Sequence, residues 1–279
     1  MKLLLSMIGL FMLAQVLGIF TGLIILSDID SNPYVEELVI TTNAEEPGNA
    51  VFFILYILFG AAVMILLIRL FKTHPIVFIL MEFGLISTSS SIVFYAVLRL
   101  LLGYELSTIA AIVMGLLFAG VKLVRPSLKN AAAVLATAGV GVIFGISLGL
   151  LPLIIFLIFL SIYDFVSVFT TKHMVELANF VMKRDLAFTV TARAPPVKMG
   201  QKERRIDLGT GDMIAPIMLE VSALSYNPVA TVFVFAGAVA SLWLFLTLVW
   251  RKKMILPALP PIVLGMTVAL LLGLVLGFY

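Results

Sequence analysis

The sequence has no cysteine and few charged residues. Of its 279 residues, only 12% are Asp, Glu, Lys or Arg, about half the share that is typical of soluble domains. The absence of cysteine excludes a disulfide framework, a thiolate metal site and a cysteine nucleophile. The two histidines, His74 and His173, are too few for a histidine-based zinc site, and we expect no metal or other cofactor.

Apolar residues dominate the composition instead. They make up 62% of the chain, and the mean hydropathy is +1.21. This composition excludes a soluble enzyme, a disordered tail and a nucleic-acid-binding domain, and it indicates a polytopic membrane protein. The net charge of only +3 also argues against a nucleic-acid partner, so the expected surroundings are a lipid bilayer.

Apolar runs long enough to cross a bilayer recur along the chain. A membrane-spanning helix needs about 20 mostly apolar residues. Nine runs meet this requirement, which predicts an all-α protein with nine transmembrane helices. Their approximate ranges are 3–27, 51–71, 76–98, 106–124, 130–149, 151–171, 208–224, 229–250 and 259–278.

The basic residues predict the orientation of these spans. With the N-terminus in the cytoplasm, 17 of the 18 Lys and Arg residues fall on cytoplasmic segments, and only Arg99 falls outside. Positive charge is enriched in cytoplasmic loops, so we expect a cytoplasmic N-terminus and an external C-terminus in a multi-pass protein of the plasma membrane. The chain then divides into helices one to six (1–171), a cytoplasmic loop (172–207) and helices seven to nine (208–279).

Four carboxylates fall within the apolar spans, where an ionisable group is costly and therefore a candidate functional residue. They are Glu82, Asp164, Asp212 and Glu220. Asp164 lies about 12 Å from the cytoplasmic end of span six at helical rise, and Asp212 lies about 8 Å past Asp207. These depths overlap in consecutive antiparallel spans, so the two aspartates are expected to face each other. Glu82 stays unassigned, and Glu220 is expected to line the outer end of a cavity or to bond to a neighbouring helix.

Two facing aspartates have a well-defined chemistry. They hold one proton between them, and the ionised carboxylate activates water while its protonated partner polarises a carbonyl group. Gly209 and Gly211 permit a close approach of the backbone just before Asp212. The segment Pro257-Ala258-Leu259-Pro260-Pro261 denies a regular helix at the same membrane face, and we interpret it as a wall of the site.

These residues resemble the signatures of the presenilin and signal peptide peptidase family of intramembrane aspartyl proteases. The resemblance rests on Tyr163-Asp164, Gly209-Thr210-Gly211-Asp212 and Pro257-Ala258-Leu259, which occur in this order on spans six, seven and nine. The motifs lie within residues 151–278, and the rest of the chain resembles the family only in its predicted arrangement of membrane spans. The long hydrophilic tail and the large loop of presenilins are missing, so the chain is similar to a microbial, archaeal homologue that acts alone.

The resemblance implies a function and its site. Asp164 and Asp212 are expected to be the catalytic pair of an aspartic endopeptidase that cleaves transmembrane helices. Tyr163, Gly209, Thr210, Gly211, Pro257, Ala258 and Leu259 are expected to shape the site and position the substrate. Single-span or signal-peptide-like membrane proteins are the expected substrates. The resemblance leaves open whether the protein forms a homo-oligomer. Thr210 departs from the pattern, because many members carry Leu at this position.

Alternatives remain from the residues alone. Membrane carboxylates and broken helices also fit a proton- or cation-coupled transporter, although no internal repeat is visible. A structural helix-packing protein is a third interpretation, but it leaves two costly carboxylates unexplained. Residues 186–192 are either a strand that pairs with unwound substrate or part of a disordered basic loop.

Overall fold

The computed structural model describes residues 2–70, 75–171, 186–194, 204–252 and 257–279. Both histidines lie outside the described residues, as do residues 172–185 and 195–203 of the predicted cytoplasmic loop.

A helix coincides with each predicted span, with ends shifted by a few residues. The membrane-length and shorter helices of the bundle are α1 (Lys2–Asp28), α3 (Gly48–Leu70), α4 (Pro75–Arg99), α5 (Tyr104–Val124), α6 (Lys129–Ser147), α7 (Leu150–Val166), α9 (Thr210–Tyr226), α10 (Pro228–Lys252) and α11 (Leu259–Val275). Two single-turn elements flank them: the 3-10 turn η1 (Pro126–Leu128) before α6, and the π-helical turn η2 (Ser167–Thr171) after α7.

Two of these helices, α9 and α11, are short, and α7, which also has 17 residues, is lengthened by η2. In the described part of the chain, seven helices are long and apolar enough to cross a membrane. α9 and α11 have 17 residues each, which gives about 26 Å at helical rise, against about 30 Å of hydrocarbon. α9 begins at Thr210, directly after β2 and two residues into its predicted span, whereas α11 begins at Leu259, where its span was predicted to begin.

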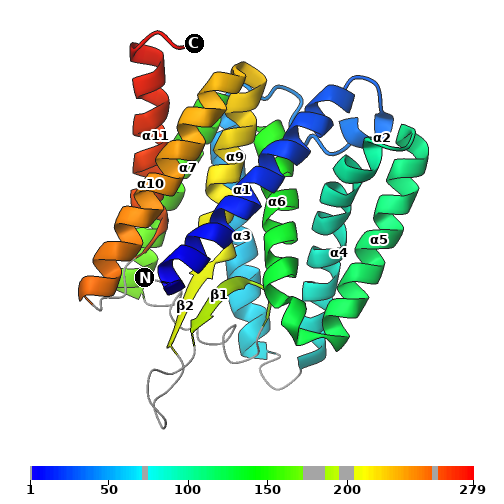
Figure 1. The fold of residues 1–279 in the computed structure, drawn as a ribbon, viewed down its shortest axis with the longest axis horizontal. Helices are drawn as coiled ribbons and strands as arrows, with labels where there is room; N and C mark the ends of the chain where they lie inside the picture. Colours follow the sequence, from blue (N-terminus) through cyan, green and yellow to red (C-terminus); the bar gives the residue numbers. More distant parts are fainter. Residues whose placement is uncertain (1, 71–74, 172–185, 195–203, 253–256) are drawn as a thin grey trace.

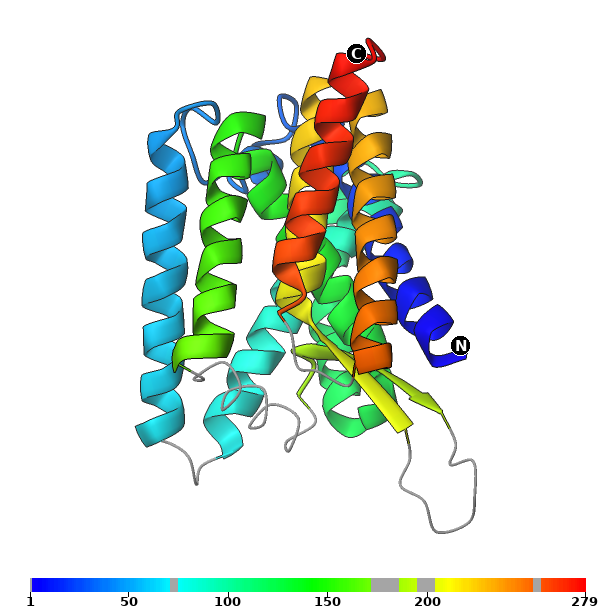
Figure 2. The same cartoon turned by 90° about the vertical axis from the view of Figure 1, so that its left-hand side faces the viewer.

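α9 lies at the centre of the bundle, packed against α1, α6 and α10 (Figures 1 and 2). Glycines allow this close approach. Gly141 and Gly145 of α6 face Ile217 and Val221 of α9, and a Cβ added at Gly145 would lie 2.7 Å from the Cβ of Val221. The four-residue glycine spacing of span five predicts close helix packing, and the structure confirms it at these two positions.

The expectation of an all-α fold is wrong at one point, because a β-hairpin lies at the lower end of the bundle (Figure 1). Its strands are β1 (Thr189–Ala194) and β2 (Arg204–Gly209), which pair antiparallel with Thr189 opposite Gly209. The β-prone stretch predicted at 186–192 therefore forms a strand shifted toward the C-terminus. β2 runs directly into α9, so the hairpin and the central helix are continuous.

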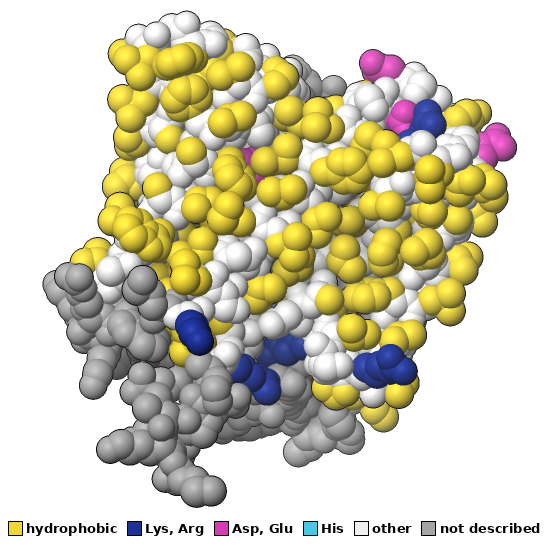
Figure 3. Space-filling model, in the orientation of Figure 1, with side chains coloured by type: hydrophobic (Ala, Val, Ile, Leu, Met, Phe, Trp, Pro, Cys, Tyr) yellow, Lys and Arg dark blue, Asp and Glu magenta, His cyan; other side chains and the backbone are white. Residues whose placement is uncertain are grey.

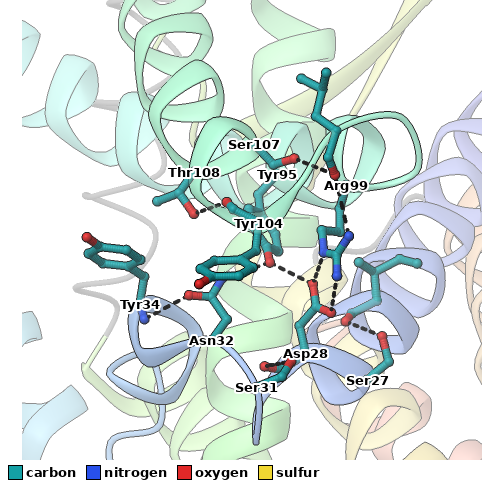
Figure 4. Close-up of polar contacts among 12 residues, drawn as sticks. Ser27, Asp28, Ser31, Asn32, Tyr34, Tyr95, Arg99, Tyr104, Ser107 and Thr108 are labelled. Carbon is teal, nitrogen blue, oxygen red and sulfur yellow. Dashed lines mark hydrogen bonds and ion pairs between the residues drawn. The ribbon is translucent and has the colours of Figure 1, made fainter.

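The end of the bundle opposite the hairpin is held by a polar network around Asp28 (Figure 4). Asp28 accepts hydrogen bonds from the Tyr95 hydroxyl at 2.6 Å and from Arg99 Nε at 2.7 Å. Asn32, which precedes the single-turn helix α2 (Pro33–Glu36), donates to the Tyr95 hydroxyl at 2.9 Å. The network accounts for Arg99, the basic residue that departs from the charge pattern, because Asp28 balances its charge.

Charged side chains separate between the two ends of the molecule. On the face shown in Figure 3, most Lys and Arg side chains gather at the hairpin end, and most Asp and Glu side chains lie at the opposite end beside one basic side chain, with a mainly apolar surface between them. The chain ends follow the same division, since the N-terminus lies toward the hairpin end and the C-terminus at the other (Figure 2). This apolar surface between polar ends is that of an integral multi-pass membrane protein.

Candidate active site

Asp164 lies near the end of α7, where the helix changes its hydrogen-bonding pattern. The Ser167 backbone N–H bonds to the carbonyls of Asp164 and Tyr163, and the Ser167 hydroxyl donates to the Asp164 carbonyl at 2.9 Å. The π-helical turn that follows widens the chain immediately after Asp164. Such turns within helices occur frequently at functional sites, because they redirect side chains.

Asp212 is the third residue of α9, and its carboxylate turns back toward the start of the helix. Gly209 is the N-cap residue, and its backbone N–H lies beside the Asp212 carboxylate and interacts with it. This is one half of a capping box, in which an acidic side chain at the third helical position reaches back to the N-cap N–H. A Cβ at Gly209 would lie 3.3 Å from Asp212 Oδ2, so glycine leaves room for this arrangement.

Asp164 is held by a second helix N-terminus, that of α11. The backbone N–H of Leu259, the first residue of α11, lies beside the Asp164 carboxylate and interacts with it. Pro260 and Pro261 occupy the next two positions and have no N–H, so Leu259 supplies the first donor of the helix. Each carboxylate therefore sits at the positive end of a helix dipole, where negative charge is stabilised.

Both carboxylates line one cavity of about 310 Å³ between α3, α6, α7 and α9. Both carboxylates are half-buried. Apolar side chains make up most of the remaining wall. Of the residues that the motifs predict, the cavity is lined by Tyr163, Asp164, Gly211, Asp212 and Leu259. A side chain added at Gly211 would meet no other atom within 4 Å, so this glycine keeps the space beside Asp212 open.

Thr210 has a structural partner that sequence reasoning missed. Its backbone N–H and its hydroxyl both donate to the Phe188 carbonyl, each at 3.1 Å. The contact fixes the first residue of α9 to the segment that precedes β1. A backbone carbonyl that lies 22 positions away carries no sequence signal, so no motif could have identified it.

The other predicted site residues lie near the cavity without lining it. Pro257 and Ala258 are buried at the entry to α11, where they set the position of Leu259. Glu220 is fully buried and is not among the lining residues, so it does not extend the cavity as expected. Within the described residues, neither of its carboxylate oxygens has a hydrogen-bond partner.

Fold and site together define a class: a multi-pass membrane protein with two carboxylates on one cavity inside its helix bundle. A protein family matches the chain over residues 8–278, and its description is signal-peptide peptidase, presenilin aspartyl protease. The chain belongs to this family and is an intramembrane aspartyl protease. No curated protein matches the chain.

Two solved structures share this fold. Both are described as a presenilin family intramembrane aspartate protease, one in space group C222 and one in P2. The first is 24% identical, with a TM-score of 0.72, and the match covers 98% of this chain and 99% of that one. The second is 26% identical, with a TM-score of 0.68 and 98% coverage of both chains.

Proposed function

We propose that Asp164 and Asp212 are the catalytic pair and hydrolyse peptide bonds of membrane-spanning substrates. The observation that carries this proposal is the shared cavity, in which each carboxylate is anchored by a helix N-terminus. Both carboxylates come from one chain, so the pair needs no second subunit. Single-span or signal-peptide-like membrane proteins are the proposed substrates.

The reaction follows from two carboxyl groups that share one proton. The ionised carboxylate takes a proton from a water molecule, whose oxygen attacks the substrate carbonyl carbon. The protonated partner donates its proton to the carbonyl oxygen, which gives a neutral tetrahedral diol. The diol then collapses and the C–N bond breaks: the protonated carboxyl group gives its proton to the leaving nitrogen, and the ionised carboxylate takes a proton from one diol hydroxyl, which restores the starting pair. The polar backbone at the start of α9 and α11 keeps both carboxylates oriented throughout.

Substrate is proposed to reach the cavity from the lipid between α3 and α7. A second cavity of about 250 Å³ lies between these helices, and it shares Ile57, Phe156, Leu160 and Tyr163 with the first. α3 packs mainly against α7, and only 11% of the residues in its most apolar stretch are buried inside the molecule. A helix with so few neighbours can move aside at low cost, which suits a lateral entrance.

The outer edge of β2 is proposed to pair with the unwound substrate. Asn130 of α6 occupies the other edge of the hairpin, because its amide donates to the Thr191 carbonyl at 2.8 Å and accepts from the Thr191 N–H at 2.9 Å. In an antiparallel pair, the N–H and C=O of one residue point to the same side. Those of Asp207, opposite Thr191, therefore point away from β1, on the strand that leads to Asp212.

The proposed topology has nine spans in the plasma membrane, with the hairpin and the N-terminus in the cytoplasm. The gathering of Lys and Arg at the hairpin end supports this orientation (Figure 3). Lys122 is an exception to its predicted place in a cytoplasmic loop, since it lies inside α5, buried and paired with Glu82.

Cleavage of a purified single-span test helix in liposomes tests the proposal. The wild type is compared with Asp164→Ala and Asp212→Ala, each checked for folding by its thermal unfolding. Cleavage that is lost in both variants is the expected result. Cleavage that survives either substitution would show that other residues carry the activity. Proton flux in the same liposomes, with no cleavage of several test helices, would favour a coupled transporter.

A further inference from the structure

Glu82 and Lys122 form a buried ion pair outside the cavity of the two aspartates. Glu82 of α4 is 2% exposed, and Lys122 of α5 is 7% exposed. Neither residue lines the cavity that holds Asp164 and Asp212. A buried ion pair is often no more stabilising than well-packed apolar side chains, so packing alone does not account for it.

The Glu82 carboxylate has a second partner, and this partner connects it to the hairpin. Glu82 Oε1, which accepts from Lys122, also accepts the backbone N–H of Ala187 at 2.5 Å. The neighbours of Ala187 strengthen the attachment, because Leu186 and Phe188 pack in a small apolar cluster with Phe78 of α4. Residues 186–188 are thus fixed to α4 by one charged acceptor and by apolar contacts.

The same segment fixes the start of α9. The Phe188 carbonyl, one residue after Ala187, accepts both hydrogen bonds of Thr210, and Asp212 follows two residues later. Contacts therefore lead from Glu82 to Ala187, from Phe188 to Thr210, and along one helical turn to the Asp212 carboxylate. Hydrogen bonds to a charged acceptor are roughly twice as strong as neutral ones, so Glu82 is the firmest point of this connection.

We propose that Glu82 is a positioning residue for Asp212, which it fixes through residues 186–188 and Thr210. This inference rests on the proposed function of the aspartate pair. Lys122 balances the charge of Glu82 and directs its oxygen toward Ala187. Displacement of a catalytic group by about 1 Å can cost about 100-fold in rate, so loosening this attachment is expected to slow the chemical step.

Two double variants isolate the hydrogen bond to Ala187 from the ion pair. Both remove the buried charges, in Glu82→Gln/Lys122→Met and in Glu82→Leu/Lys122→Met. The side chains at position 82 have similar volumes, but only Gln keeps an oxygen that accepts the Ala187 N–H. Amide hydrogen exchange at residues 186–189 and 210–212 reports on the attachment, and kcat and KM for a test helix report on its consequence.

The proposal predicts that the Leu-containing variant exchanges faster in both segments than the Gln-containing variant. Its kcat is expected to be lower by about 10-fold or more, with a similar KM. Equal exchange in the two variants would refute the attachment, and equal kcat would refute its role in positioning. The amide hydrogen exchange tests the attachment whether or not the two aspartates are catalytic. If Asp164→Ala and Asp212→Ala both cleave as the wild type does, the aspartate pair fails, and the positioning of Asp212 for catalysis fails with it.

Discussion

At the scale of the residue, the two glycines before Asp212 face different surroundings. A Cβ at Gly209 would crowd Asp212 Oδ2 at 3.3 Å, whereas a Cβ at Gly211 would point into open cavity space. The first glycine therefore leaves room for the carboxylate, and the second leaves open the cavity space beside it. The spacing of the motif thus follows from a helix N-terminus whose third residue must reach back to the N-cap.

We expect Gly209→Ala to lower kcat by about 10-fold or more, because the added methyl group displaces the Asp212 carboxylate. Gly209 has φ −64° and ψ 142°, which alanine adopts without strain, so the fold is expected to survive. The matched variant Gly211→Ala is expected to act mainly by raising KM. Steady-state cleavage of a test helix separates the two effects, and a Gly209→Ala enzyme with wild-type kcat would contradict this account.

Several residue contacts were beyond sequence reasoning. The placement of both aspartates on one cavity and of Leu259 in its wall could be predicted, because helical depth and proline placement are local properties of the chain. The catalytic role of the two aspartates stays a prediction. Glu82 could not be assigned, because its partners Lys122 and Ala187 lie 40 and 105 positions away. Such pairings depend on how the helices cross, and a single sequence does not record this.

At the scale of the element, α9 depends on glycine contacts with its neighbours. Gly145→Ala is expected to lower the free energy of unfolding by about 1–3 kcal/mol, because the new methyl group meets Val221 and the Met218 carbonyl. Gly9→Ala is the control, since a Cβ there meets no atom within 4 Å. Reversible unfolding in mixed micelles measures both, and equal stabilities would contradict the packing described for α9.

The hairpin yields a second prediction at this scale. Asp207→Pro removes the N–H that points away from β1, whereas Asp207→Ala keeps that N–H and removes the same side-chain contact with Thr191. If substrate pairs with β2, the proline variant is expected to show a KM several-fold above that of the alanine variant. Kinetics on one test helix decide this, and equal KM values would place the substrate elsewhere.

Element boundaries show where sequence patterns lose resolution. Apolar periodicity located the helices, but it extended the sixth span through residues 167–171, which form a π-helical turn. It also assigned residues 208–209 to a helix, although they belong to β2. In both places the chain leaves the regular helix beside an aspartate, so local composition and structure disagree where the site is built.

At the scale of the whole molecule, the absence of cysteine permits a direct test of orientation. Glu46 and Ser127 are exposed at opposite ends of the bundle. A membrane-impermeant maleimide is expected to label Glu46→Cys in intact cells and Ser127→Cys only after the membrane is permeabilised. Unsubstituted protein, with no cysteine, is the control for background. The reverse pattern would overturn the proposed cytoplasmic N-terminus.

The central claim is that Asp164 and Asp212 act together on one peptide bond. The most direct measurement is kcat for a purified test helix with Asp164→Asn and Asp212→Asn, which preserve side-chain shape and remove the shared proton. Asp30→Asn, exposed at the far end of the bundle, is the control. Loss of at least about 1,000-fold in each single variant, with wild-type kcat in the control, is the predicted result. Substantial activity in either asparagine variant would contradict the paired mechanism.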